Sequence, residues 1–159
     1  MFERFGEFDS AEELNKTAEG LKKEGDIESL KVLAEENGLE VEDAEDYAKG
    51  AFPEFVNVKS AALGKIEAEC RELNPKEIIA DWVEYIRAEC LWSKEMAAAV
   101  RKKGKSLKGC IAKLLVWSFK NSYEVDKEIL KEAKVSQHCK MGIPGMAQAK
   151  QMIREYYMG

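Results

Sequence analysis

The chain has 159 residues, of which 45% are apolar, 35% are charged and only three are proline. This composition excludes a disordered chain and predicts a soluble, helix-rich domain of ordinary size. No apolar run approaches the roughly 18–20 residues that a membrane helix needs. The first residues also lack a signal-peptide pattern, so we expect a cytoplasmic protein that does not contact membranes.

Acidic and basic residues are divided unequally along the chain. Residues 1–57 hold 17 acids and 6 bases, a net charge of −11, whereas residues 58–159 hold 13 acids and 19 bases, a net charge of +6. Together the two parts account for the overall net charge of −5. This division predicts two surfaces with different partners, or an acidic segment that folds against a basic one.

Three short helices are predicted in the first fifty residues, where they form an acidic unit. Capping residues and closing glycines mark their ends at Ser10, Gly25, Asp26, Gly38 and Gly50. We therefore divide the chain into an acidic N-terminal helical unit, residues 1–50, and a helical body with a basic central segment, residues 51–159.

The body is predicted to hold longer helices with wider apolar faces. Pro53 suits the first turn of one helix, and Asn74 with Pro75 can begin the next. Ser93 and Ser106 can begin two more. The helix that follows Ser106 is apolar nearly all round toward its end, which is typical of the central helix of a bundle.

The C-terminal part contains a break between two helices. Asp126 can cap one helix, Met146 lies at the start of the last, and residues 135–143 are the only candidate for a short hairpin. No segment alternates long enough to require a sheet. The predicted fold class is all-α: a compact bundle of about seven to eight short helices with an acidic N-terminal helical unit.

The tripeptide Gly104-Lys105-Ser106 has the sequence that ends a phosphate-binding loop in nucleotide hydrolases. Such a loop needs a glycine at the position of Ala99, because its backbone amides must curl around phosphate, and it needs a strand before it. Neither is present. We therefore interpret the stretch as a corner between two helices, with Ser106 as the cap of the second.

Eight bases and a single acid lie within residues 94–120. We take as the candidate basic face, for a partner or for nucleic acid, Arg101, Lys102, Lys103, Lys105 and Lys108. Non-specific nucleic-acid binding needs such a cluster, although no interleaved aromatic side chains accompany it. A solvated surface, or a surface on which the acidic unit docks, are the alternatives.

Seven acids lie from Glu35 to Asp46, in a segment whose residue spacing is typical of a helix-turn-helix. Carboxylates repel DNA phosphates, so this unit is not expected to read DNA. Carboxylates spaced along helices instead imitate a phosphate track that fits a partner's basic channel. The candidate acidic partner-binding residues are Glu35, Glu36, Glu42, Asp43, Glu45 and Asp46. An ordinary charge-repelling surface is the alternative.

No group of residues predicts an enzyme, a metal site or a cofactor. His138 is the only histidine and adjoins Cys139, whereas a nucleophilic Cys–His pair normally comes from separate elements. The four cysteines include no C-x-x-C pair, so neither a zinc cluster nor a disulfide framework is indicated. We expect reduced thiols, no catalytic residue, no metal and no cofactor.

Four segments together resemble a group of small, mostly uncharacterised accessory proteins carried on conjugative and other mobile elements of anaerobic gut bacteria. These segments are MFERFGEFDSAEELN, LAEENGLEVEDAEDYAKGA, VRKKGKSLKGCIAKLL and GIPGMAQAKQMIREYY. The resemblance brings no catalytic motif with it. It implies a regulator, or an inhibitor of a host defence such as a CRISPR nuclease.

The leading hypothesis is therefore a non-enzymatic, protein-binding accessory protein of a mobile element. Its expected partner is a protein, such as a CRISPR nuclease or another nucleic-acid-handling defence effector, which it blocks through charged helical faces. The alternative hypothesis is a small DNA- or RNA-binding accessory or regulatory factor that acts through the basic segment, residues 94–120.

Overall fold

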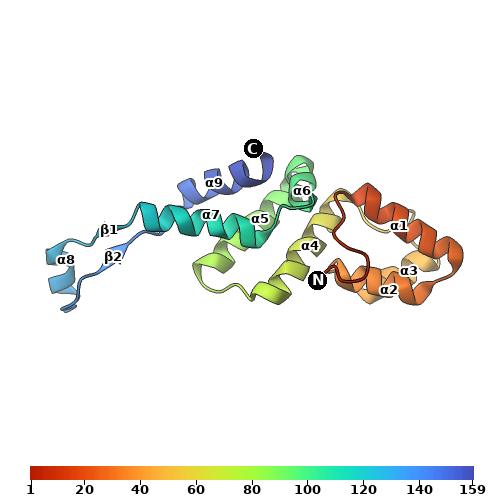
Figure 1. Ribbon diagram of the computed structural model, residues 1–159, viewed down its shortest axis with the longest axis horizontal. Helices are drawn as coiled ribbons and strands as arrows, with labels where there is room; N and C mark the ends of the chain where they lie inside the picture. Colours follow the sequence, from red (N-terminus) through yellow and green to blue (C-terminus); the bar gives the residue numbers. More distant parts are fainter.

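The computed structural model describes residues 1–159 and confirms the predicted all-α class. It contains nine helices and two strands of two residues each (Figure 1). Their bounds are α1 Ala11–Glu24, α2 Ile27–Glu36, α3 Val41–Ala48, α4 Val58–Leu73, α5 Ile78–Trp92, α6 Lys94–Arg101, α7 Leu107–Lys120, β1 Tyr123–Glu124, α8 Lys127–Glu132, β2 Lys140–Met141 and α9 Met146–Met158. None of these helices combines the length and the apolar character needed to cross a membrane.

Most helix ends lie where local sequence signals predicted them. The Ser10 hydroxyl accepts a hydrogen bond from the Glu13 N–H at 3.2 Å, and Gly25 closes α1 with a φ of 71°. The same kind of side-chain cap begins α2, α6 and α7, at Asp26, Ser93 and Ser106. These caps satisfy N–H groups that have no partner within the helix.

Two predicted helix starts are wrong. α4 begins at Val58 rather than near Pro53, because Asn57 forms a capping box with Ser60. Asn74 ends α4 in a left-handed conformation, with a φ of 45°, instead of capping α5. Asparagine is suited both to N-caps and to left-handed helix ends, so its type alone does not say which end of a helix it marks.

α4 lies between two hydrophobic clusters. One cluster is built mainly from α1, α2 and α3 of the N-terminal unit, and the other from the helices of the body (Figure 1). The adjacent residues Ala61 and Ala62 of α4 belong to different clusters. α4 therefore supplies one wall of each cluster and joins the acidic unit to the body.

Two glycines allow the acidic unit to approach α4 closely. A Cβ on Gly64 would lie 2.3 Å from the carbonyl oxygen of Asn37, and a Cβ on Gly38 would lie 2.0 Å from that of Gly64. Gly38 also has a φ of +66°, which a side chain would disfavour. The backbones therefore meet without a side chain between them, which fixes where the unit sits on the body.

α7 is not the central helix that its apolar sequence predicted. Its first turns bury one face in the body, at Leu107, Cys110 and Leu114. Farther along, α7 extends away from the body (Figure 1), and its exposed side chains there include Leu115, Val116 and Phe119. A helix that is apolar on two sides needs two partners, and this chain packs against only one side.

Residues 121–145 form an arm beyond the end of α7. β1 pairs antiparallel with β2, with Tyr123 opposite Met141, and α8 lies in the connection between them. The hairpin predicted over residues 135–143 is wrong, because only β2 falls there and its partner strand lies on the far side of α8. Gly142 has no room for a Cβ, which would lie 2.3 Å from an α7 carbonyl oxygen, so the returning chain lies against that helix.

Candidate functional site

The Gly-Lys-Ser stretch forms a corner between α6 and α7, which confirms the interpretation from sequence. α6 ends at Arg101, and Gly104 turns the chain with a φ of 79°. The hydroxyl of Ser106 then accepts a hydrogen bond from the Gly109 N–H at 3.0 Å and caps α7. Serine suits this position because the first turn of a helix leaves backbone N–H groups unpaired, and the serine hydroxyl can accept a hydrogen bond from one of them.

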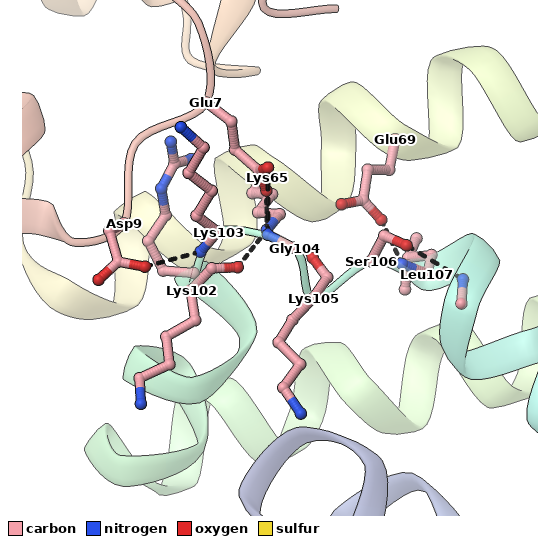
Figure 2. A network of polar contacts seen from close by, with 12 residues as sticks. Glu7, Asp9, Lys65, Glu69, Lys102, Lys103, Gly104, Lys105, Ser106 and Leu107 are labelled. Atoms are coloured by element: carbon pink, nitrogen blue, oxygen red, sulfur yellow. Dashed lines mark hydrogen bonds and ion pairs between the residues drawn. The ribbon is translucent and has the colours of Figure 1, made fainter.

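Carboxylates of the N-terminal segment accept hydrogen bonds from the backbone N–H groups of this corner. The Lys103 N–H donates to Asp9 Oδ1 at 3.0 Å, and the Gly104 N–H donates to Glu7 Oε2 at 3.2 Å (Figure 2). A phosphate-binding loop uses such N–H groups to hold a nucleotide. In this chain they hold its own anions, which makes the corner a structural contact between the acidic and basic segments.

Lys65 lies at the centre of this contact and is only 1% exposed. Its ammonium group donates to Glu7 Oε1 at 2.6 Å, to the Lys102 carbonyl at 2.8 Å and to the Lys105 carbonyl at 2.6 Å (Figure 2). All three ammonium protons therefore have acceptors. Burial nevertheless lowers the pKa of Lys65, with Glu7 opposing that shift.

Glu69, one turn farther along α4, is buried on the other side of the corner. One of its carboxylate oxygens accepts a hydrogen bond from the Leu107 N–H at the first residue of α7 (Figure 2). A negative charge at this end complements the helix dipole. Burial raises the pKa of Glu69, and its hydrogen bond to Leu107 opposes that shift.

Arg101 lies inside the protein rather than on the basic face to which it was assigned. Its guanidinium donates to Asn37 Oδ1 at 2.8 Å, and the rings of Phe2 and Phe8 lie 5.7 and 6.0 Å from its central carbon. Burial lowers the pKa of Arg101 to about 10. Because it joins α6 to the end of α2, this residue is a structural link and presents no charge to a partner.

The remaining basic residues divide between structure and surface. The Lys105 ammonium donates to the Tyr156 carbonyl at 2.6 Å, so it is tied to the end of α9. Lys102, Lys103 and Lys108 have exposed side chains. Of the five residues proposed for a basic face, three therefore remain available to a ligand.

The six acidic residues proposed for partner binding divide in the same way. Glu36 accepts hydrogen bonds from the Arg4 and Phe5 N–H groups at 2.6 and 3.1 Å, and Glu45 pairs with Lys31 at 2.9 Å. The others are exposed and define what we call the acidic face: Glu35, Glu42, Asp43 and Asp46. Within it, only Asp46 has a cation nearby, Lys49 at 4.0 Å.

The residues considered for chemistry are not assembled into a catalytic site. His138 is exposed on the arm, with its Nδ1 3.6 Å from a carboxylate oxygen of Glu124. No group of three or more His, Cys, Asp or Glu side chains is placed to hold a metal ion. Burial raises the pKa of Cys90 and of Cys110 to about 12, which leaves both as unreactive thiols at neutral pH.

Sequence reasoning missed the network around Lys65, although a weak signal for it exists. Lys65 and Glu69 occupy the same face of α4 as Ala61, Ala62 and Ile66, which are buried. Charged side chains interrupting an apolar helical face can mark a buried ionic contact. Their partner Glu7 lies 58 residues away in sequence, so no local pattern identifies it.

The chain is an all-α protein in which a buried charged network joins the acidic unit to the body. Comparison with protein families, with curated proteins and with solved structures gives no match to this chain.

Replacing Glu69 by glutamine is expected to change how stability depends on pH. The pKa of Glu69 is raised above its ordinary value of 4.5, so the folded protein binds this proton at higher pH than the unfolded chain does. Its contribution to stability is therefore fully present below about pH 4.5 and is lost as the pH rises through the raised pKa. As the pH falls from neutral, the wild type should gain stability relative to Glu69→Gln.

Urea unfolding followed by circular dichroism over this pH range measures the difference between the two proteins. Glu132→Gln, an exposed change of the same chemistry on α8, serves as the control. Parallel pH profiles for the wild type and Glu69→Gln would contradict the expected linkage.

Proposed function

We propose that this chain is a non-enzymatic protein-binding protein whose acidic face engages a basic surface on a protein partner. The observation that carries the proposal is the fixed attachment of the acidic face to the body. A surface that already has its bound shape loses little conformational entropy on binding. The acidic unit can therefore act as a preformed binding surface.

Contacts with the body and contacts within the unit hold the acidic unit in place. Asn37, at the end of α2, accepts a hydrogen bond from Arg101 of the body, and its backbone lies against Gly64 of α4. Within the unit, Glu36 accepts hydrogen bonds from the N–H groups of Arg4 and Phe5 and so holds the N-terminal segment against α2. The carboxylates of Glu35, Glu42 and Asp43 are left exposed.

The chemistry of the acidic face favours a basic partner. Glu35, Glu42 and Asp43 are exposed and form no ion pair within the chain. Carboxylates in this state attract cations at long range and speed association with a positively charged surface. A groove that normally binds nucleic acid is one surface of that kind, because it is lined with Lys and Arg.

The narrower proposal concerns the identity of the partner. The resemblance to accessory proteins of mobile elements supports an anti-defence inhibitor, with a CRISPR nuclease as the partner. In that role the carboxylates would occupy positions that DNA or RNA phosphates otherwise take in the nuclease channel. This part of the proposal depends on the resemblance, whereas binding through the acidic face depends on the exposed carboxylates.

Reversing two charges of the acidic face is expected to weaken inhibition of an RNA-guided DNA nuclease. The probe is a purified CRISPR nuclease loaded with its guide, whose cleavage of duplex DNA is measured against increasing amounts of this protein. The double variant Glu42→Lys, Asp43→Lys should require at least about tenfold more protein for the same inhibition, a loss of about 1.4 kcal/mol. Added salt should weaken the wild type toward the variant.

The matched control is Glu77→Lys with Asp81→Lys at the start of α5, where two exposed acids that form no ion pair give the same change in net charge. It should inhibit as the wild type does. If both double variants inhibit equally, the acidic face is not the binding surface. Undiminished cleavage at a large excess of the wild type would reject this nuclease as the partner.

The second candidate function is nucleic-acid binding through Lys102, Lys103 and Lys108. It is favoured by the exposure of these three side chains around the corner between α6 and α7. It is weakened because Arg101 is buried and Lys105 is bound to Tyr156. A gel shift of duplex DNA or RNA that declines steeply with salt, and with these three lysines changed to glutamate, would support this candidate over the first.

A further inference from the structure

We propose that the chain forms a symmetric dimer through the exposed apolar side of α7 and the adjoining arm. We call this surface the α7–arm face and define it by Leu115, Val116, Phe119, Tyr123, Met141 and Ile143. Each of these side chains is at least half exposed, with Phe119 at 77%. The inference goes beyond the proposed function, because it concerns a different surface and a different partner.

The helical part of the face is a continuous apolar stripe. Leu115 and Phe119 are four residues apart, and Val116 and Phe119 are three apart, which places all three on one side of α7. Ala112 adjoins them one turn earlier and is also exposed. The side that carries Leu114 is buried in the body, so α7 has one apolar side covered and a second one open to water.

The arm extends this stripe beyond the helix. Tyr123 and Met141 are direct partners across the β1–β2 pair, so their side chains lie on the same face of the ribbon. Ile143 follows on the returning chain, and Gly142 holds that chain against the end of α7. Backbone contacts therefore hold the exposed apolar residues of the arm beside the end of α7. Apolar surfaces that continue from one element to the next mark interaction sites.

The total accessible surface area is large enough for a second copy of this chain to be the occupant. The chain exposes 9865 Å², whereas a compact monomer of its mass, 18.0 kDa, exposes about 8,000 Å². The difference is about 1,800 Å². Obligate homodimers bury roughly 1,000–2,500 Å² on each subunit, so covering the extended surface with another copy would bring the exposed area to an ordinary value.

Charge also favours a second copy over nucleic acid. Residues 121–141 carry four acids and four lysines, so the arm has no net charge with which to bind phosphates or to repel another arm. α7 itself carries three lysines and no acid, and two of them, Lys113 and Lys120, lie within four residues of Val116 in the sequence. A predominantly apolar face can pair with itself about a twofold axis, which is how most homodimers assemble.

Such a dimer would carry two acidic faces far from its twofold axis. The N-terminal unit and the arm lie at opposite ends of the molecule (Figure 1). Pairing through α7 and the arm therefore leaves each acidic unit at an outer end of the assembly. The arrangement keeps both acidic faces free and makes the assembly bivalent for any partner that they bind.

Light scattering coupled to size-exclusion chromatography tests the proposal on the full chain. The wild type should have about twice the 18.0 kDa mass of the chain and should dissociate only on dilution. Phe119→Asp should elute at the monomer mass, because an added carboxylate would be buried against its own symmetry mate. Trp92→Asp, the loss of an aromatic that is 87% exposed at the end of α5, is the matched control and should remain dimeric.

Hydrogen exchange provides a second measurement that does not depend on a variant. The backbone amides in the second half of α7 should exchange more slowly as the wild-type concentration rises, whereas those of α3 should not change. A wild type that is monomeric throughout the accessible concentration range overturns the proposal. So does a folded Phe119→Asp that remains a dimer, because the interface would then lie elsewhere.

Discussion

Replacing Lys65 by methionine is expected to lower the free energy of unfolding by about 3–5 kcal/mol, the usual cost of removing one partner from a buried ion pair. The apolar stem of methionine fits the space that the lysine stem fills. It cannot replace the three hydrogen bonds that the ammonium donates to Glu7 and to the carbonyls of Lys102 and Lys105. Those acceptors would be left without their donor in a partly closed site.

The control for this prediction is Lys76→Met, which removes the same charge from an exposed position before α5. It should change stability by less than about 0.5 kcal/mol. Chemical unfolding of both variants measures the difference. Glu7→Gln should be milder than Lys65→Met, because its amide oxygen can still accept from the ammonium, although its NH2 group cannot accept from the Gly104 N–H. Equal stability of Lys65→Met and Lys76→Met would show that the buried contact contributes nothing.

The fold class and most helix ends could be predicted because the forces that set them act within a few residues. A serine or aspartate cap bonds an N–H two or three residues away, so Ser10, Asp26 and Ser93 mark helix starts regardless of what packs around them. The errors at Pro53 and Asn74 come from residue types that fit several local conformations. Which conformation such a residue adopts depends on the segments before and after it.

The parts of the candidate site that sequence reasoning misplaced depend on contacts distant in sequence. Arg101 was assigned to an exposed basic face and Lys65 was not singled out, because buried charges are rare and need partners. Their partners Asn37 and Glu7 come from a different helical unit, 64 and 58 residues away. The charge division along the chain did indicate that an acidic segment could fold against a basic one. It did not identify which residues meet.

The apolar sequence of α7 was correctly identified, but its placement was not. Periodicity shows that a helix has two apolar sides without showing what covers each one. Leu114 is covered by this chain and Leu115 is not. A helix buried inside one chain and a helix buried between two chains have the same sequence pattern. Only the positions of the other helices show which of the two applies.

Replacing Gly64 by alanine is expected to cost about 2–3 kcal/mol, because the new methyl group would overlap the backbone after α2. Its Cβ would lie 2.3 Å from the Asn37 carbonyl oxygen and 2.9 Å from a methyl carbon of Leu39. Relief requires the whole acidic unit to move, since the nearest obstacle is backbone. Gly20→Ala is the opposite case. Nothing lies within 4 Å of its Cβ, so it should stabilise α1 by about 0.5–1 kcal/mol.

Two spectroscopic probes can show that the damage from Gly64→Ala lies between the unit and the body. All three tryptophans, Trp82, Trp92 and Trp117, lie in α5 and α7, so their fluorescence reports on the body. Far-UV circular dichroism reports on every helix. In the wild type both signals should unfold together, whereas in Gly64→Ala the dichroism should begin to fall first. Coincident transitions at an unchanged midpoint would mean that the two glycines do not hold the acidic unit on α4.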